Sequence, residues 1–133
     1  MQQNNQNRAE LAKDWVLKAQ NDLKSAEILS RESGPTDSLC FHCHQASEKI
    51  LKGFLVYKTG LFPRIHDLLK LLNLCKEIDE DFNNAIDQAS FLNRYYTETR
   101  YPSEVMTYDE DECKKALEYT NRLSQFVINK IKL

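Results

Sequence analysis

Apolar residues recur at spacings of three and four from Leu39 to Tyr57, and no proline interrupts the run. Residues with this spacing lie on one face of an α-helix, because one helical turn takes 3.6 residues. The segment therefore predicts a helix that turns one face to a hydrophobic core and keeps polar residues along its edges. The expected core stripe comprises Leu39, Cys43, Ala46, Ile50, Leu51, Phe54 and Leu55.

The same helical spacing appears elsewhere in the chain, whereas strand-like alternation does not. Further helices are predicted over about 8–31, 67–75, 80–99 and 108–131. Gly34-Pro35 is expected to end the helix over 8–31, and Pro102 is expected to end the helix over 80–99. In both places proline cannot continue the backbone hydrogen bonding of a helix. The predicted fold class is all-α, an up-and-down bundle of four long helices plus one short helix.

Two connections carry informative side chains. Thr36, Asp37 and Ser38 are expected to cap the central helix with their side-chain oxygens. Leu61 and Phe62 follow the end of that helix, and these large apolar side chains are expected to tuck beneath the helices.

The chain of 133 residues is the size of a single domain, and 41% of its residues are hydrophobic. Residues 1–7 form a polar, amide-rich tail that is expected to be disordered, which assigns the bundle to residues 8–133. A formal net charge of −2 argues against a broad polyanion-binding surface. No secretory signal and no apolar run of membrane-spanning length is found, so a cytoplasmic location without membrane contact is predicted.

Cys40, Cys43 and His44 lie at positions i, i+3 and i+4 of the central helix, where one face offers soft ligands to zinc. A structural zinc site usually takes paired ligands from two elements, and no second Cys/His pair occurs in the sequence. The chain is therefore predicted to bind no metal and no cofactor. Its four cysteines are expected to be reduced core residues, and its histidines to lie at the helix edge.

Catalytic chemistry has no clear signature in the sequence. A nucleophilic site needs a thiol or hydroxyl held by a base, and the spacing of His42, His44 and His66 selects no such arrangement. The three glycines belong to no phosphate-binding loop pattern. No catalytic residue is therefore assigned.

Four side chains are candidates for binding an anion. Lys49 and Lys52 flank the core stripe of the central helix. His66 directly precedes the next helix, and Arg100 follows a tyrosine-rich helix end. Each of these side chains can contact phosphate when it is charged. The structural alternatives are a solvated helix edge for the lysines, a helix cap for His66 and a helix-dipole partner for Arg100.

Three stretches follow one another in a characteristic order: FHCHQASEKILKGFL at 41–55, IHDLLKLL at 65–72 and LNRYYTETRYPSE at 92–104. Together they resemble the HEPN domain (higher eukaryotes and prokaryotes nucleotide-binding). The resemblance extends over about residues 15–131. It implies a bundle of four to five helices that is commonly a homodimer, often with a minimal nucleotidyltransferase subunit as its partner.

Some relatives in this family resemble RNA-cleaving toxins in which an arginine precedes a histidine by four to six residues. Arg64 lies only two residues before His66, Arg31 lies eleven residues before His42, and the later arginines have no histidine after them. Because the motif is absent, the resemblance implies a nucleotide-binding or partner-binding protein. The ligand-groove positions that it implies are Lys49, Lys52, His66, Arg100 and Tyr101.

The leading hypothesis is a non-catalytic module that binds a nucleotide or similar polyanion and pairs with itself and with a nucleotidyltransferase, as one half of a toxin–antitoxin-like pair. Two alternatives stay open. One is a metal-independent ribonuclease in which His66 meets Arg100, and the other is a non-catalytic dimerisation scaffold. More aromatic side chains occur than one small core needs, and exposed ones often anchor interfaces. Those with this expected role are Tyr57, Phe62, Tyr95, Tyr101 and Tyr108.

Overall fold

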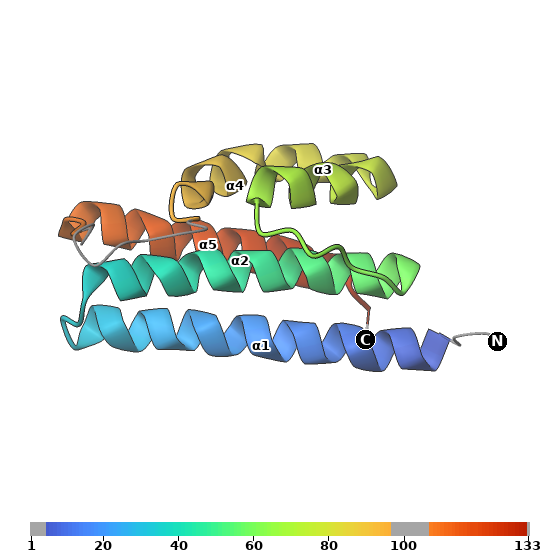
Figure 1. Ribbon diagram of the computed structural model, residues 1–133, viewed down its shortest axis with the longest axis horizontal. Helices are drawn as coiled ribbons and strands as arrows, with labels where there is room; N and C mark the ends of the chain where they lie inside the picture. The colour runs from blue at the N-terminus through green and yellow to red at the C-terminus, as the bar shows by residue number, and fades with distance from the viewer. Residues whose placement is uncertain (1–4, 97–106, 133) are drawn as a thin grey trace.

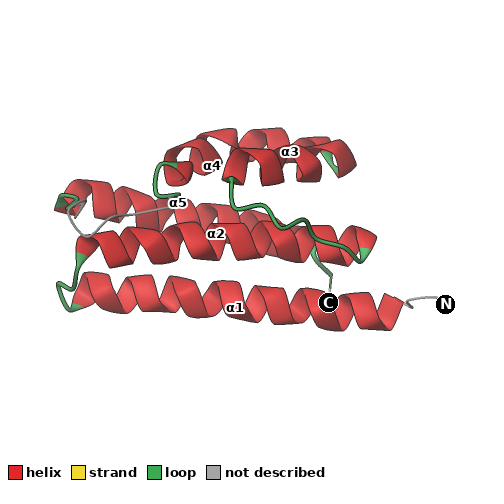
Figure 2. Ribbon diagram, in the orientation of Figure 1, coloured by secondary structure: helices red, strands yellow, loops and turns green. Residues whose placement is uncertain are grey.

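The computed structural model describes residues 5–96 and 107–132 of the chain. Every regular element in these residues is a helix, so the predicted all-α class is confirmed (Figure 2). Within these ranges, no helix combines the length and the apolar composition that a membrane crossing requires. The elements are α1 (Asn5–Arg31), α2 (Thr36–Thr59), α3 (Leu68–Ile78), the 3₁₀-helix η1 (Glu80–Ala85), α4 (Ile86–Asn93) and α5 (Glu110–Lys130).

Helix α2 occupies the centre of the bundle (Figure 1). α1 runs antiparallel along one side of it, and α3, η1 and α4 lie on the side away from α1. α2 also contacts α5, so it has neighbours around most of its circumference. The predicted core stripe of α2 is confirmed, since all seven of its residues are buried.

Three close contacts hold the elements in place around α2. The Phe82 ring of η1 lies 4.5 Å from that of Phe54 in α2 and 5.1 Å from that of Phe126 in α5, measured between ring centroids. Gly53 lets α1 approach α2, because a Cβ added there would lie 3.3 Å from Cβ of Trp15. These contacts join α1, α2, η1 and α5 through one core.

The fourth helix is shorter than its apolar spacing predicts. The predicted stretch 80–99 begins as η1 and becomes α-helical at Ile86, because Ala85 has φ −103° and ψ 6°, outside the α-helical region. The α-helix then ends at Asn93. Residues 97–99 of the prediction lie outside the described residues. The spacing could not show the break, since both kinds of helix keep one side of the chain toward the core.

Two predictions for the connections are wrong. Leu61 is 73% exposed and Phe62 is 43% exposed, because their loop runs outside α2, whose core side is already covered by α3 and α5. Helix α2 starts after Pro35 without a side-chain cap. The Thr36 hydroxyl instead accepts a hydrogen bond from the backbone N–H of Tyr108 at 2.9 Å, which ties the start of α2 to the approach to α5.

Candidate functional site

A buried carboxylate on α2 holds a lysine and a histidine. Glu48 accepts from Lys52 Nζ at 2.9 Å, and the two side chains are 6% and 5% exposed. Both oxygens of Glu48 also lie 3.1 Å from His66 Nδ1. A carboxylate can only accept, so His66 donates from Nδ1, and Nε2 is the ring nitrogen that does not contact Glu48. The His66 side chain is 59% exposed, so it is the member of this group that solvent and ligands reach.

The connection between α2 and α3 brings His66 to Glu48. Gly60 ends α2 in the left-handed conformation with φ 79°, and the chain then turns back along α2 (Figure 1). Asp67 ends the connection as the N-cap of α3, accepting from the backbone N–H of Leu69 at 2.9 Å. The cap is therefore Asp67, and His66 faces the Glu48 carboxylate.

His44 is buried at 1% exposure, so the prediction that it lies at the helix edge is wrong. Its ring stacks on that of Tyr96 at 5.7 Å, and Tyr96 also lies 6.2 Å from the ring of His66. Among the described residues, His44 Nε2 has no hydrogen-bond partner. Burial lowers the pKa of His44, while the Glu48 charge opposes this shift. We call Glu48, Lys52, His66, His44 and Tyr96 the Glu48 cluster.

A second carboxylate, Asp22 of α1, pairs with the other predicted lysine. Lys49 Nζ lies 2.6 Å from one oxygen of Asp22, and His42 Nδ1 lies 2.8 Å from the other. The charges of both predicted lysines are thus compensated, that of Lys52 by Glu48 and that of Lys49 by Asp22. The Lys49–Asp22 ion pair joins α2 to α1, and Lys52 neutralises the buried carboxylate of Glu48.

Of the five predicted ligand-groove residues, the structure brings Lys52 and His66 to one carboxylate and places Lys49 on a separate one. Arg100 and Tyr101 lie outside the described residues. Sequence reasoning missed the roles of Glu48, Asp22 and His44. The i, i+4 spacing of Glu48 and Lys52 was the one signal for their pairing, because such residues are neighbours on a helix.

The aromatic residues predicted to anchor a dimer have different surroundings. The prediction is wrong for Tyr95, because this residue is 2% exposed and its hydroxyl donates a hydrogen bond to Glu112 at 2.7 Å. Phe62 is 43% exposed, whereas Tyr57 and Tyr108 are partly buried. Tyr101 lies outside the described residues. Some of the aromatic residues predicted to anchor an interface therefore pack inside the bundle instead.

All four cysteines are buried, so the prediction that they are core residues is confirmed, and none of them is in a disulfide. Burial raises the pKa of Cys43 and Cys75 to about 12 and raises that of Cys40 and Cys113 as well. Thiols in this state are poor nucleophiles and poor metal ligands. In the described part of the chain, no three His, Cys, Asp or Glu side chains are arranged to hold a metal ion.

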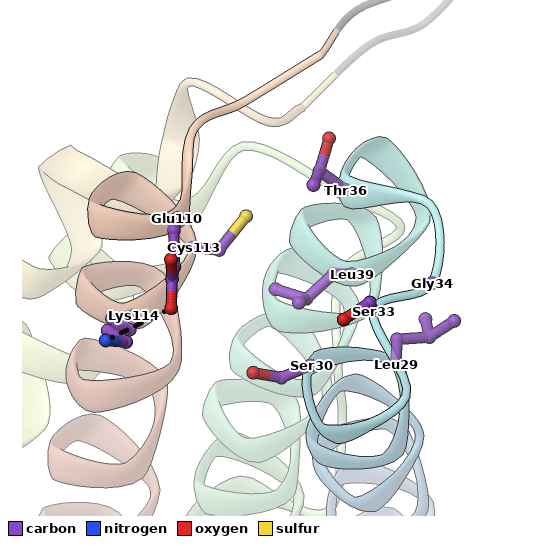
Figure 3. A pocket seen from close by; sticks show the side chains of 9 residues that line it. All are labelled: Leu29, Ser30, Ser33, Gly34, Thr36, Leu39, Glu110, Cys113 and Lys114. Carbon is purple, nitrogen blue, oxygen red and sulfur yellow. Dashed lines mark ion pairs between the residues drawn. The ribbon is translucent and has the colours of Figure 1, made fainter.

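A separate hollow of about 290 Å³ lies between the α1–α2 turn and the first turn of α5 (Figure 3). Ser30, Ser33 and Thr36 line it together with an ion pair between Glu110 and Lys114 at 3.3 Å. It contains none of the residues predicted to bind a ligand. We therefore base the candidate site on the Glu48 cluster and not on this hollow.

Comparisons with known proteins agree with this architecture. The family model described as HEPN domain matches residues 12–131. A crystal structure of TT1696 from Thermus thermophilus is 29% identical, with a TM-score of 0.75 over 90% of this chain and 98% of that one. The archaeal HEPN homologue ST0689 is 24% identical and shares the fold, with a TM-score of 0.72 over 91% of this chain and 98% of its own. No curated protein matches the chain.

Proposed function

We propose, from the premise that this chain belongs to the HEPN domain family, that it is a binding module for a nucleotide or a similar phosphate-bearing polyanion at the Glu48 cluster. The observation that supports this most is the contact of His66 Nδ1 with buried Glu48 at 3.1 Å. Because Nδ1 faces the carboxylate and the side chain is 59% exposed, Nε2 is the nitrogen that we assign to ligand contact. When protonated, this nitrogen donates to a phosphate oxygen.

The lysines have an indirect role in this proposal. Lys52 compensates the charge of Glu48, so a phosphate that approaches His66 does not meet an unpaired carboxylate. Direct contact with the ligand is assigned to His66, and to Arg100 and Tyr101 from their place in the sequence. An arginine is suited to this role because its guanidinium binds phosphate through two parallel hydrogen bonds.

Calorimetric titration of ATP or GTP tests the proposal. We expect the wild type to bind at sub-millimolar nucleotide, and His66→Ala and Arg100→Ala each to weaken binding about tenfold, the effect of losing one hydrogen bond to a charged group. Arg64→Ala is the matched control, because Arg64 is an exposed cation two residues from His66. No binding by the wild type, or equal loss in the control, would contradict the proposal.

We also propose that the chain pairs with itself and with a minimal nucleotidyltransferase subunit, as one half of a toxin–antitoxin-like pair. An apolar groove of about 490 Å³ between the end of α2 and α3 supports an interface, since Leu61 and Ile78 line it and are exposed. Light scattering of the chain alone and with such a subunit gives the stoichiometry; a monomer in both solutions would contradict this pairing.

RNA cleavage is a second candidate, and one observation favours it. A histidine held at Nδ1 by a buried carboxylate has the orientation of a general acid or base, although the usual arginine–histidine motif is missing. In this reading His66 acts on RNA and Glu48 is a positioning residue. We expect labelled RNA to be cut by the wild type and by His42→Ala, whose histidine contacts Asp22 instead, but not by His66→Ala. Intact RNA with the wild type would exclude this activity.

A further inference from the structure

The single tryptophan of the chain forms an aromatic pair with an exposed loop residue. The rings of Trp15 and Phe62 lie 4.8 Å apart between centroids, with an interplanar angle of 66°. Trp15 is partly buried and Phe62 is 43% exposed. This edge-to-face geometry places one ring against the edge of the other, so the pair forms a corner with aromatic surface on two sides.

The pair lies beside the Glu48 cluster. Lys52 Nζ lies 5.9 Å from the centroids of both Trp15 and Phe62, and 2.9 Å from Glu48 Oε2. The same carboxylate oxygen is 3.1 Å from His66 Nδ1. These contacts form a continuous series from the indole through Lys52 and Glu48 to the imidazole.

A second lysine, Lys18, also lies over the indole ring of Trp15. Lys18 Nζ is 5.9 Å from the Trp15 centroid, and within residues 5–96 and 107–132 this exposed lysine has no ion pair. A flexible, solvated side chain moves aside at little cost. Its ammonium group then remains within reach of an anionic group bound beside the ring.

We propose that Trp15 and Phe62 form a stacking site for the base of the nucleotide whose phosphate the Glu48 cluster binds. The inference rests on the proposed function and specifies its ligand as a molecule with an aromatic base next to its phosphate. Every nucleobase presents a π-face, and stacking on an aromatic side chain adds affinity without reading the base. Inorganic polyphosphate would engage only the cationic end of the site.

Fluorescence of Trp15 tests the inference directly, because no other tryptophan contributes to the signal. ATP is titrated into the wild type, with inorganic triphosphate as the ligand that lacks a base. We expect ATP to quench Trp15 and triphosphate to leave its emission unchanged. Phe62→Ala is expected to weaken ATP binding about fivefold or more, the effect of one lost base stack, with no change for triphosphate.

Phe41→Ala is the matched control, since Phe41 is the same residue type as Phe62 and is 48% exposed. Calorimetry is run on the same samples to separate the two proposals. If ATP binds without quenching Trp15 and Phe62→Ala binds equally well, the stacking site is wrong and the proposed function stands. If no nucleotide binds, the proposed function itself fails. Trp15 emission that shifts with protein concentration alone would mean that a second copy covers the ring, which also overturns the stacking site.

Discussion

Replacing Glu48 with glutamine is expected to destabilise the protein by about 3–5 kcal/mol, the usual cost of removing one partner from a buried ion pair. The carboxylate and Lys52 are 6% and 5% exposed at the side chain, so solvent cannot take over the pairing. The neutral amide would leave the buried ammonium of Lys52 without a counter-charge. In urea unfolding, the loss of stability is expected to lower the midpoint concentration of urea. The slope of the unfolding free energy against urea concentration is expected to stay the same.

The double variant Glu48→Gln/Lys52→Met separates the loss of charge compensation from the loss of packing. Removing both charges is expected to recover most of the stability, because the stranded ammonium is no longer present. Glu118→Gln is the matched control, since Glu118 also pairs with a cation four residues on, Arg122, but both are exposed. A Glu48→Gln variant as stable as this control, or a double variant no better than the single one, would show that the pair is not effectively buried.

Acidification is expected to destabilise the protein through His44. Burial lowers its folded-state pKa below the ordinary value of 6.5, so the unfolded chain binds the proton more readily than the folded one. Stability is therefore lost as the pH falls from 6.5 toward the lowered folded pKa, by up to about 1.4 kcal/mol per pH unit. Unfolding free energies measured across this window give the slope.

His44→Phe is the informative variant for this effect. Phenylalanine can keep the stack on Tyr96, which lies 5.7 Å from the His44 ring, but it takes up no proton. We expect a smaller pH slope in this variant than in the wild type, because the buried group that takes up a proton only on unfolding is no longer present. Equal slopes in the wild type and His44→Phe would mean that another group controls the acid response.

The helical framework could be predicted because its signal is local. The spacing of apolar residues in α2 predicted a buried stripe, and every one of its members is buried. Gly34-Pro35 predicted the end of α1 near Arg31 for an equally local reason, the lack of a backbone donor in proline. The division of the 80–99 stretch into η1 and α4 could not be predicted, since the apolar period continues through Ala85.

The candidate site was predicted only in part because its contacts join distant parts of the chain. Lys49 and Lys52 were singled out as candidates, but the Asp22 partner of Lys49 could not be assigned without knowing how α2 faces α1. His66 was noticed for its place before a helix, whereas its contact is 18 residues away in the sequence. His44 looked like an edge residue until α4 and the turn after it placed Tyr96 against its ring.

The sequence by itself determined the helices of this protein, since the period of its apolar residues and its proline breaks act over one or two turns. It also carried enough of the family pattern to identify the HEPN domain. Only the tertiary structure decided which cations remain available to a ligand. Lys49 and Lys52 are compensated by buried or half-buried acids and His66 is exposed, because charge pairing depends on distance in space and not on order in the chain.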